Sequence, residues 1–144
     1  MADLFSIKPS ATSSLSSITA GATTTVTRNN VKLVLKDYTI FAQWLGNEDD
    51  TPFYFCNEYK RDCAQMVDVF TSTTKIKTVD FFPGRNDVIM IARKNGIYAV
   101  EADKRKVQNF ALVYAGGDPD FRIGRNGVIY VRDGDNYYSL TLSI

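Results

Sequence analysis

The 144-residue sequence contains no histidine and only two cysteines, and this shortage excludes many kinds of active site. Ser-His and Cys-His nucleophile pairs need an imidazole, as do zinc and haem sites with histidine ligands. Two thiolates are too few for a four-cysteine metal site within one chain. The sequence also lacks a Gly-x-x-x-x-Gly-Lys-Ser/Thr loop and a Gly-x-Gly-x-x-Gly segment after a strand. We therefore expect a protein that is not an enzyme and holds no metal or cofactor.

Long apolar runs and an excess of one charge are also missing. No apolar run approaches the roughly 20 residues of a membrane-spanning helix, so we expect no membrane insertion by this chain. Residues 1–9 lack a basic start followed by an apolar stretch and are not expected to be a secretory signal. The formal net charge is +1, which gives no electrostatic reason to expect nucleic acid. Acidic residues also interleave the arginines that lie near tyrosines, namely Arg85, Arg93, Arg105, Arg122, Arg125 and Arg132.

Helical periodicity is absent, and the most informative stretch is residues 79–103. This stretch reads as strand, Pro83-Gly84 turn, strand, Asn95-Gly96 turn and strand, with no room for a helix. The apolar run 87–92 is typical of a strand buried on both faces. Asn95-Gly96 predicts a type I′ hairpin turn, which needs positive φ at both central positions. The pattern indicates one blade of an antiparallel repeat protein.

The first 30 residues form a separate zone, which we interpret as a Ser/Thr-rich leader. Within it, residues 10–27 are rich in small and hydroxyl side chains. Such a segment buries too little apolar surface to offset its ordering entropy, which favours a flexible leader. The alternative is an extended strand that pairs with a sheet edge of a neighbouring copy. In that case the residues that anchor the assembly are Leu15, Ile18 and Val26.

Residues 31–144 are expected to form a β-blade domain. Four short strands are predicted at 31–36, 38–45, 53–56 and 64–70, which together match one propeller blade. Further strands are predicted at 74–81, 87–92, 96–101, 109–114, from Phe121, at 128–131 and at 137–142. The fold class is therefore all-β, with about two and a half antiparallel propeller-type blades. Because propellers usually have four to eight blades, one chain is too short to close a ring.

Several of these segments resemble a known family. Phe82-Pro83-Gly84 before an apolar strand resembles the rhythm of TolB-like and WD-repeat propellers. The chain is more closely similar to the C-terminal β-propeller region of PEGA-domain-containing bacterial surface proteins, over residues 31–142. The similar pieces are 44–46, 52–56, 81–88, 96–101, 108–109 and 118–122. The resemblance implies a propeller-type fold and an extracytoplasmic or cell-surface location, and it implies no specific activity.

The two cysteines, Cys56 and Cys63, flank a short polar excursion. A disulfide between them would close a small loop and stiffen it. The alternative is two reduced, buried thiols that behave as small apolar side chains. Since the resemblance is to surface proteins, where oxidising conditions permit disulfides, we favour the disulfide.

Other polar groups have weaker functional readings. Glu48, Asp49 and Asp50 offer carboxylates for a cation, but a charge run in a loop is usually a solvated face. Residues 133–136, Asp-Gly-Asp-Asn, carry oxygen ligands that calcium uses but lack the rest of a calcium loop, and Asp-Gly is a common hairpin turn. Glu101 and Asp103 share a strand face, without further signs of glycosidase chemistry.

The sequence therefore predicts a structural or protein-interaction module. An open array of blades leaves sheet faces and edges that proteins normally cover. With 9 Phe, 8 Tyr and 1 Trp the chain has ample aromatic surface for packing between blades. We expect a homo-oligomer, or binding to other copies of such blades. The alternative is a propeller-type binding domain for carbohydrate or peptide that uses the loops at one end of the blades.

Overall fold

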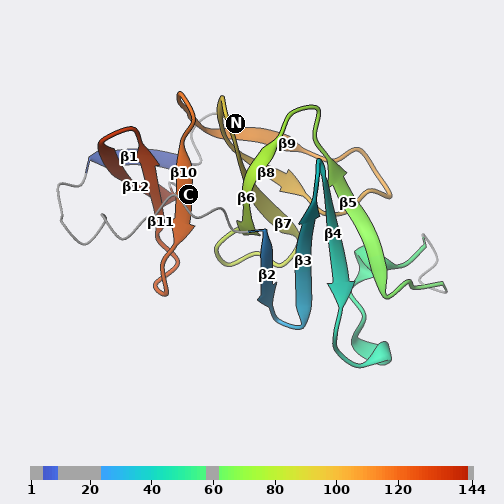
Figure 1. Ribbon diagram of the computed structural model, residues 1–144. Helices are drawn as coiled ribbons and strands as arrows, with labels where there is room; N and C mark the ends of the chain where they lie inside the picture. Colours follow the sequence, from blue (N-terminus) through green and yellow to red (C-terminus); the bar gives the residue numbers. More distant parts are fainter. Residues whose placement is uncertain (1–4, 10–23, 58–61, 143–144) are drawn as a thin grey trace.

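The computed structural model describes residues 5–9, 24–57 and 62–142, which form three separate four-stranded antiparallel sheets (Figure 1). The all-β prediction is confirmed: helical structure in these residues is limited to the 3-10 turns η2 (Glu48–Asp50) and η3 (Phe53–Phe55). In the part of the chain that the structure covers, no helix has the length and apolar character to cross a membrane.

The first sheet has the strand order β2-β3-β4-β5. Its strands are β2 (Thr25–Arg28), β3 (Val31–Lys36), β4 (Thr39–Trp44) and β5 (Met66–Thr71). The alternation expected for half-buried strands is present, because Leu33 and Ile40 are fully buried whereas Lys36 is exposed. The first sheet therefore has one face in a core.

The middle sheet has the order β6-β7-β8-β9. Its strands are β6 (Ile76–Phe81), β7 (Val88–Arg93), β8 (Gly96–Glu101) and β9 (Phe110–Ala115). The apolar run predicted to be buried on both faces lies in β7, and the structure confirms this. Ile89 and Ile91 belong to one core cluster, whereas Met90 and Ala92 belong to a second. Successive side chains of a strand point to opposite faces, so β7 serves a core on each side of its sheet.

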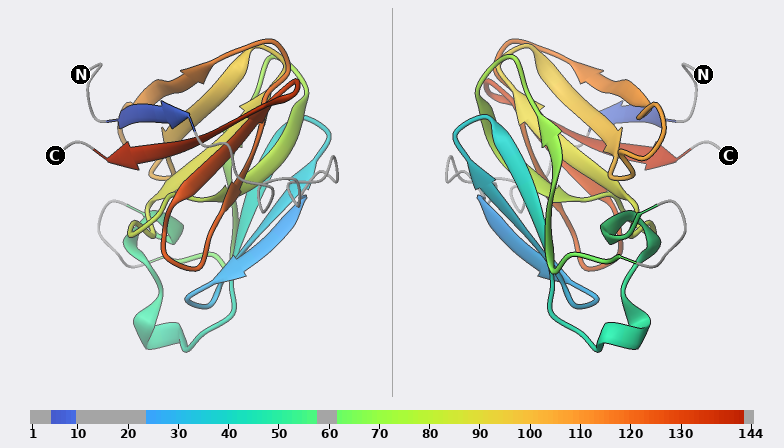
Figure 2. Two further views of the ribbon diagram at one scale, coloured as in Figure 1. Left: turned by 90° about the vertical axis from the view of Figure 1, so that its left-hand side faces the viewer. Right: turned by 90° about the vertical axis from the view of Figure 1, so that its right-hand side faces the viewer.

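The third sheet has the order β1-β12-β11-β10. Its strands β10 (Asp120–Ile123), β11 (Ile129–Asp133) and β12 (Asn136–Leu142) come from the C-terminal part of the chain, and β1 (Phe5–Pro9) pairs antiparallel with the outer edge of β12. Figure 2 shows β1 and β12 lying side by side. The sequence predicts two and a half blades, and the structure has three complete sheets because β1 and β2 supply strands from the range interpreted as a leader.

The three predicted assembly residues fall in different places. Val26 lies in β2 and packs against the core between the first and middle sheets. Leu15 and Ile18 lie outside the described residues.

The sheets form three layers with the middle sheet between the other two (Figure 1). One core fills the space between the first and middle sheets, and the other fills the space between the middle and third sheets. We call β2, β6 and β10 the leading strands of the first, middle and third sheets, and β5, β9 and β1, at the opposite edges, the outer strands. The leading strands lie close together, because β6 contacts both β2 and β10. A hydrogen bond of 2.6 Å from Thr78 Oγ1 on β6 to Asp120 Oδ1 on β10 is buried at one of these contacts.

One predicted strand is wrong. Residues 53–56 do not form a strand, because Phe53–Phe55 is the 3-10 turn η3, closed by bonds from Phe55 N to Pro52 O and from Cys56 N to Phe53 O. Tyr54 and Phe55 stack at 4.8 Å and are both buried in the first core. A strand would send these consecutive rings to opposite faces, whereas the turn lets both reach one core.

The predicted type I′ turn is also displaced. The β7–β8 turn is Lys94-Asn95, and Gly96 is already paired with Arg93 as the first residue of β8. Lys94, Asn95 and Gly96 all lack a positive φ. A Cβ at Gly96 would lie 2.7 Å from the Tyr114 carbonyl oxygen, so this glycine permits close approach of β9. Positive φ at both central positions occurs instead in the β2–β3 turn, at Asn29 (51°) and Asn30 (64°).

Candidate interaction surfaces

Opposite its core, the first sheet has a face that no other described segment covers, which we call its uncovered face. Val34, Phe41 and Met66 lie on this face and line a shallow hollow of about 100 Å³ together with Lys36. Val34 and Phe41 are directly paired across β3 and β4, and the Met66 side chain is 50% exposed. Three apolar side chains therefore lie together where a sheet that faces water would carry polar ones.

The third sheet likewise has a face that no other described strand covers, with a different composition, and this is its uncovered face. Its core face carries Phe121, Ile129, Val131 and Leu140, and the residues that alternate with these point the other way. Arg122 is paired with Tyr130, and Arg132 with Tyr137, across the strands of this opposite face. Tyrosine and arginine are the residue types that protein interfaces favour.

The outer edges of the sheets differ in how they are protected. The edge strand β5 contains Asp68, whose carboxylate forms an ion pair of 2.9 Å with Lys104; this pairing lowers the pKa of Asp68. The edge strand β9, in contrast, contains no charged residue, and its Phe110 and Leu112 side chains are 41% and 54% exposed. Charged side chains on an edge discourage pairing with other chains, so β9 is the less protected of these two edges.

Arg28 joins the first sheet to the middle sheet at one end of their interface. Its guanidinium donates to the carbonyl oxygens of Phe82, at 3.0 Å, and Arg85, and lies 4.8 Å from the centre of the Phe81 ring. These carbonyls belong to the predicted Pro-Gly turn, which is confirmed by a bond from Arg85 N to Phe82 O and a φ of +75° at Gly84. Arg28 therefore fixes this turn against β2.

Burial raises the pKa of two groups near this turn. Burial raises the pKa of Asp80, although the nearby Arg28 guanidinium acts in the opposite direction. Burial also raises the pKa of Tyr54 to about 12, and the negative charge of Asp87 adds to the effect. The Tyr54 hydroxyl donates to the Asn86 carbonyl at 3.5 Å, so η3 is anchored to the same loop. Both shifts are what burial of an acidic group produces.

Arg93 also joins the first sheet to the middle sheet, through a stack of aromatic rings. Its guanidinium lies 4.4 Å from the centre of the Tyr98 ring and 5.2 Å from that of Phe110, and its Nη1 donates to Ser72 Oγ at 3.1 Å. Phe110 in turn stacks on Phe70 of β5 at 5.3 Å. The stack therefore runs from the middle sheet to the edge of the first sheet and holds the two together by cation–π and aromatic contacts.

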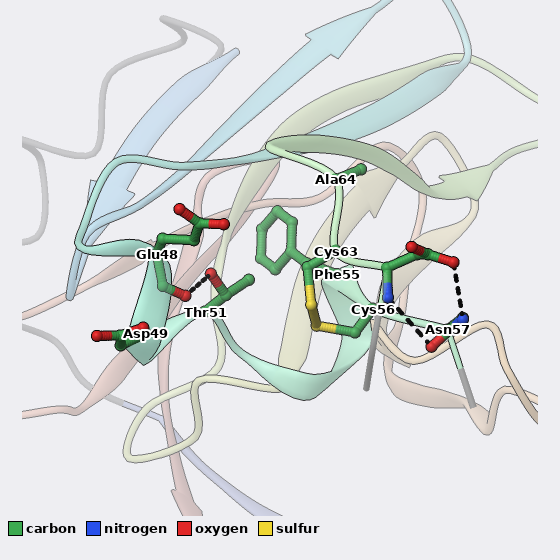
Figure 3. A pocket seen from close by; sticks show the side chains of 9 residues that line it. Glu48, Asp49, Thr51, Phe55, Cys56, Asn57, Cys63 and Ala64 are labelled. Carbon is green, nitrogen blue, oxygen red and sulfur yellow. Dashed lines mark hydrogen bonds between the residues drawn. A yellow bond between two sulfur atoms is a disulfide. The ribbon is translucent and has the colours of Figure 1, made fainter. Parts of the chain in front are cut away.

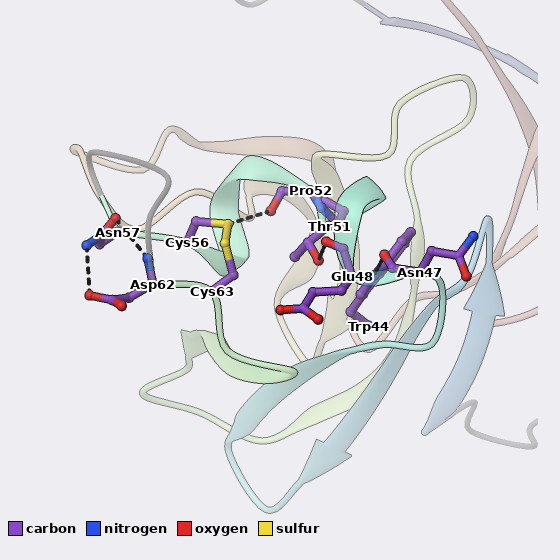
Figure 4. The surroundings of a disulfide bond; sticks show 9 residues. All are labelled: Trp44, Asn47, Glu48, Thr51, Pro52, Cys56, Asn57, Asp62 and Cys63. Carbon is purple, nitrogen blue, oxygen red and sulfur yellow. Dashed lines mark hydrogen bonds between the residues drawn. A yellow bond between two sulfur atoms is a disulfide. The ribbon is translucent and has the colours of Figure 1, made fainter.

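The predicted disulfide between Cys56 and Cys63 is present (Figure 4). It links two residues that form an antiparallel bridge, and Asn57 donates to the Asp62 carboxylate beside it at 3.3 Å. On the other side, Trp44 Nε1 donates to the Asn47 carbonyl at 2.7 Å, and its ring lies 6.4 Å from that of Phe55. The disulfide and the tryptophan thus brace the long loop between β4 and β5.

A cavity of about 660 Å³ opens in this loop. Figure 3 shows Glu48 and Thr51 on one side, the disulfide and Asn57 on the other, and the Phe55 ring between them. The three acidic residues considered as cation ligands, Glu48, Asp49 and Asp50, lie on the exposed turn η2. The described residues contain no group of three or more histidine, cysteine or acidic side chains arranged to hold a metal ion.

The remaining candidates have structural partners. Asp103 is buried and accepts from Arg105 Nε at 2.9 Å and Nη2 at 3.1 Å, which lowers the pKa of Asp103. Glu101 Oε1 accepts from the Asn109 backbone at 2.9 Å. Gly134 and Asp135 form the two-residue β11–β12 turn, with a φ of +62° at Gly134. The two carboxylates considered for glycosidase chemistry thus each brace the β8–β9 connection.

Val34, Phe41 and Met66 are not among the surface residues predicted from the sequence. A signal was available, because Val34 and Phe41 are apolar at positions that alternate with the core residues Leu33 and Ile40. Apolar residues on both faces of a strand indicate that both faces of its sheet are covered.

Comparison with known proteins gave no relatives: no family model matches the chain, and no curated protein or solved structure is significantly similar to it.

Proposed function

We propose that this protein is a structural module that assembles with other copies of itself, by packing the uncovered face of the third sheet on the uncovered face of the first. In this arrangement the three sheets act as consecutive propeller blades, and two copies supply six. The observation that carries the proposal is the apolar group Val34, Phe41 and Met66 on a face that nothing in the described chain covers.

The order of the sheets supports a ring of blades. The leading strands β2 and β10 both lie against β6, as inner strands do around a propeller axis. The two uncovered faces lie on opposite sides of the array and differ from each other, so each contact between copies joins unlike faces. Two such contacts, related by a twofold axis, close a ring of two copies and cover both kinds of face.

A cell-surface location is part of the proposal. Disulfides persist mainly in oxidising compartments, which favours a site outside the cytoplasm for a chain with the Cys56–Cys63 bond. The resemblance of residues 31–142 to the propeller region of PEGA-domain surface proteins points in the same direction.

The test uses charge on each face. Phe41→Glu and Tyr130→Glu should each dissociate the dimer without unfolding the chain, because a carboxylate cannot be buried unpaired between sheets. Val107→Glu is the matched control, since Val107 is 89% exposed in a loop. Mixing the two variants should partly restore dimers, because one contact between unmodified faces is regained. Variants that keep the native mass, or a wild-type chain that sediments as a monomer, would contradict the proposal.

A second candidate function is binding of carbohydrate or peptide by the loops, favoured by the 660 Å³ cavity beside the disulfide. Trp44 is the single tryptophan of the chain and lies against Phe55, which lines this cavity. Titration with neutral oligosaccharides or extended peptides should then change its fluorescence in a saturable way. A flat response to both classes would remove this candidate.

A further inference from the structure

Two of the three connections between sheets join adjacent sheets, and the third does not. From the outer strand of one sheet the chain continues to the leading strand of the adjacent sheet, through residues 72–75 from β5 to β6 and residues 116–119 from β9 to β10. The third connection, residues 10–24, also runs from an outer strand, β1, to a leading strand, β2. Within one copy, however, β1 and β2 belong to sheets on opposite sides of the middle sheet.

The exception disappears in the proposed assembly. There the third sheet of a second copy lies directly against the first sheet of this copy. If β1 pairs with β12 of that second copy, it becomes the outer strand of the sheet adjacent to β2. All three connections then join adjacent sheets in the same direction, consistent with the general tendency of consecutive elements to be neighbours.

We propose that β1 is exchanged between two copies, so that Phe5–Pro9 of each completes the third sheet of the other. This inference rests on the proposed function and names the segment that ties the two copies together. The exchanged strand keeps the antiparallel register recorded within one chain, in which Ser6 faces Thr141 and Lys8 faces Ser139. Exchange of an identical element costs little, because the same pairings form in both arrangements.

The exchange also protects a strand that would otherwise be an edge. Without β1, β12 would have one hydrogen-bonded neighbour among the described strands, β11, and would expose its other side. Its Leu140 is 3% exposed and its Tyr138 packs against the second core. Loss of pairing on β12 would therefore loosen a strand that carries core residues, and strand exchange links that protection to assembly.

The experiment is a cysteine pair placed across the β1–β12 register. Lys8→Cys combined with Ser139→Cys should form a disulfide on oxidation, because directly opposed residues of antiparallel strands lie within disulfide reach. The native cysteines are already bonded to each other, so the wild-type chain should remain uncrosslinked. Ser6→Cys with Thr141→Cys is a second in-register pair in case the first variant fails to fold, and Lys8→Cys with Thr141→Cys is the out-of-register control.

The outcomes are read on denaturing gels without reductant and by native mass. A covalent dimer from the in-register pairs, but not from the control, supports exchange. Refolding a mixture of the single variants Lys8→Cys and Ser139→Cys should also give a covalent dimer. A covalently closed monomer that still associates as a native dimer would overturn the exchange and leave the proposed function standing. A covalently closed monomer with a native mass of one chain would overturn both.

Discussion

The middle sheet and the two outer sheets are built from similar strands but are covered differently. Strand β7 of the middle sheet buries Ile89 and Ile91 in one core and Met90 and Ala92 in the other. Strands β3 and β4 of the first sheet bury Leu33 and Ile40 on one face and leave Val34 and Phe41 over a hollow on the other. Among the described residues, the middle sheet is covered on both faces, whereas each outer sheet is covered on one face alone. This difference is why we infer a partner.

The largest expected effect is on stability, and it compares a buried sheet face with an uncovered one. Ile91 is fully buried, and Ile91→Ala should lower the free energy of unfolding by about 2–5 kcal/mol through lost burial and a residual cavity. Val34→Ala on the uncovered face should change it by less than about 1 kcal/mol under conditions where the chain is monomeric. Urea titration measures both. Equal losses in the dilute monomer would mean that the two faces are buried alike within one copy.

The next effect concerns the loop that the disulfide closes outside the first sheet. Replacing both Cys56 and Cys63 by Ser should reduce stability by about 2–3 kcal/mol, because the open loop regains conformational freedom in the unfolded chain. Thermal unfolding with and without reductant gives the same comparison for the wild-type chain. Reduction that leaves the transition temperature unchanged would show that the loop does not unfold with the sheets.

A smaller effect tests the boundary between the middle and first sheets. Arg93→Ala removes the cation from the Tyr98 and Phe110 rings and should cost about 2 kcal/mol. Arg125→Ala is the matched control, because Arg125 is exposed in the β10–β11 loop, and its cost should be within about 0.5 kcal/mol. If the two variants unfold at the same denaturant concentration, the ring stack does not hold the sheets together.

The smallest expected effect is a dependence on pH from the β8–β9 loop of the middle sheet. The bonds from Arg105 hold the pKa of Asp103 below its usual value, so the folded state binds fewer protons than the unfolded state. The resulting stability is present above about pH 4, the ordinary pKa of Asp, and is lost as pH falls through the lower folded-state value. Asp103→Asn should therefore cost about 1.5 kcal/mol at pH 7. The cost should shrink toward zero in strong acid. A cost that is the same at pH 7 and pH 2 would show that the stability does not come from the ionised Asp103 carboxylate.

The sequence predicts the all-β class and most strands because alternation and turn residues are local signals. Pro83-Gly84 specifies its own turn, and the apolar run of β7 indicates burial on both faces. The misassigned segments depend on tertiary contacts. Phe53–Phe55 turns so that two adjacent rings reach one core, and Gly96 is needed for the approach of β9 and not for a turn. The pairing of β1 with β12 joins the two ends of the chain, and no local pattern encodes it.

The most direct test of this account is the mass of the wild-type particle, measured by sedimentation over a range of concentrations. We predict a particle of twice the 16.1 kDa chain mass that dissociates on dilution and that the Phe41→Glu variant does not form. A particle of one chain mass at every concentration would contradict the claim that a second copy covers the open faces of the outer sheets.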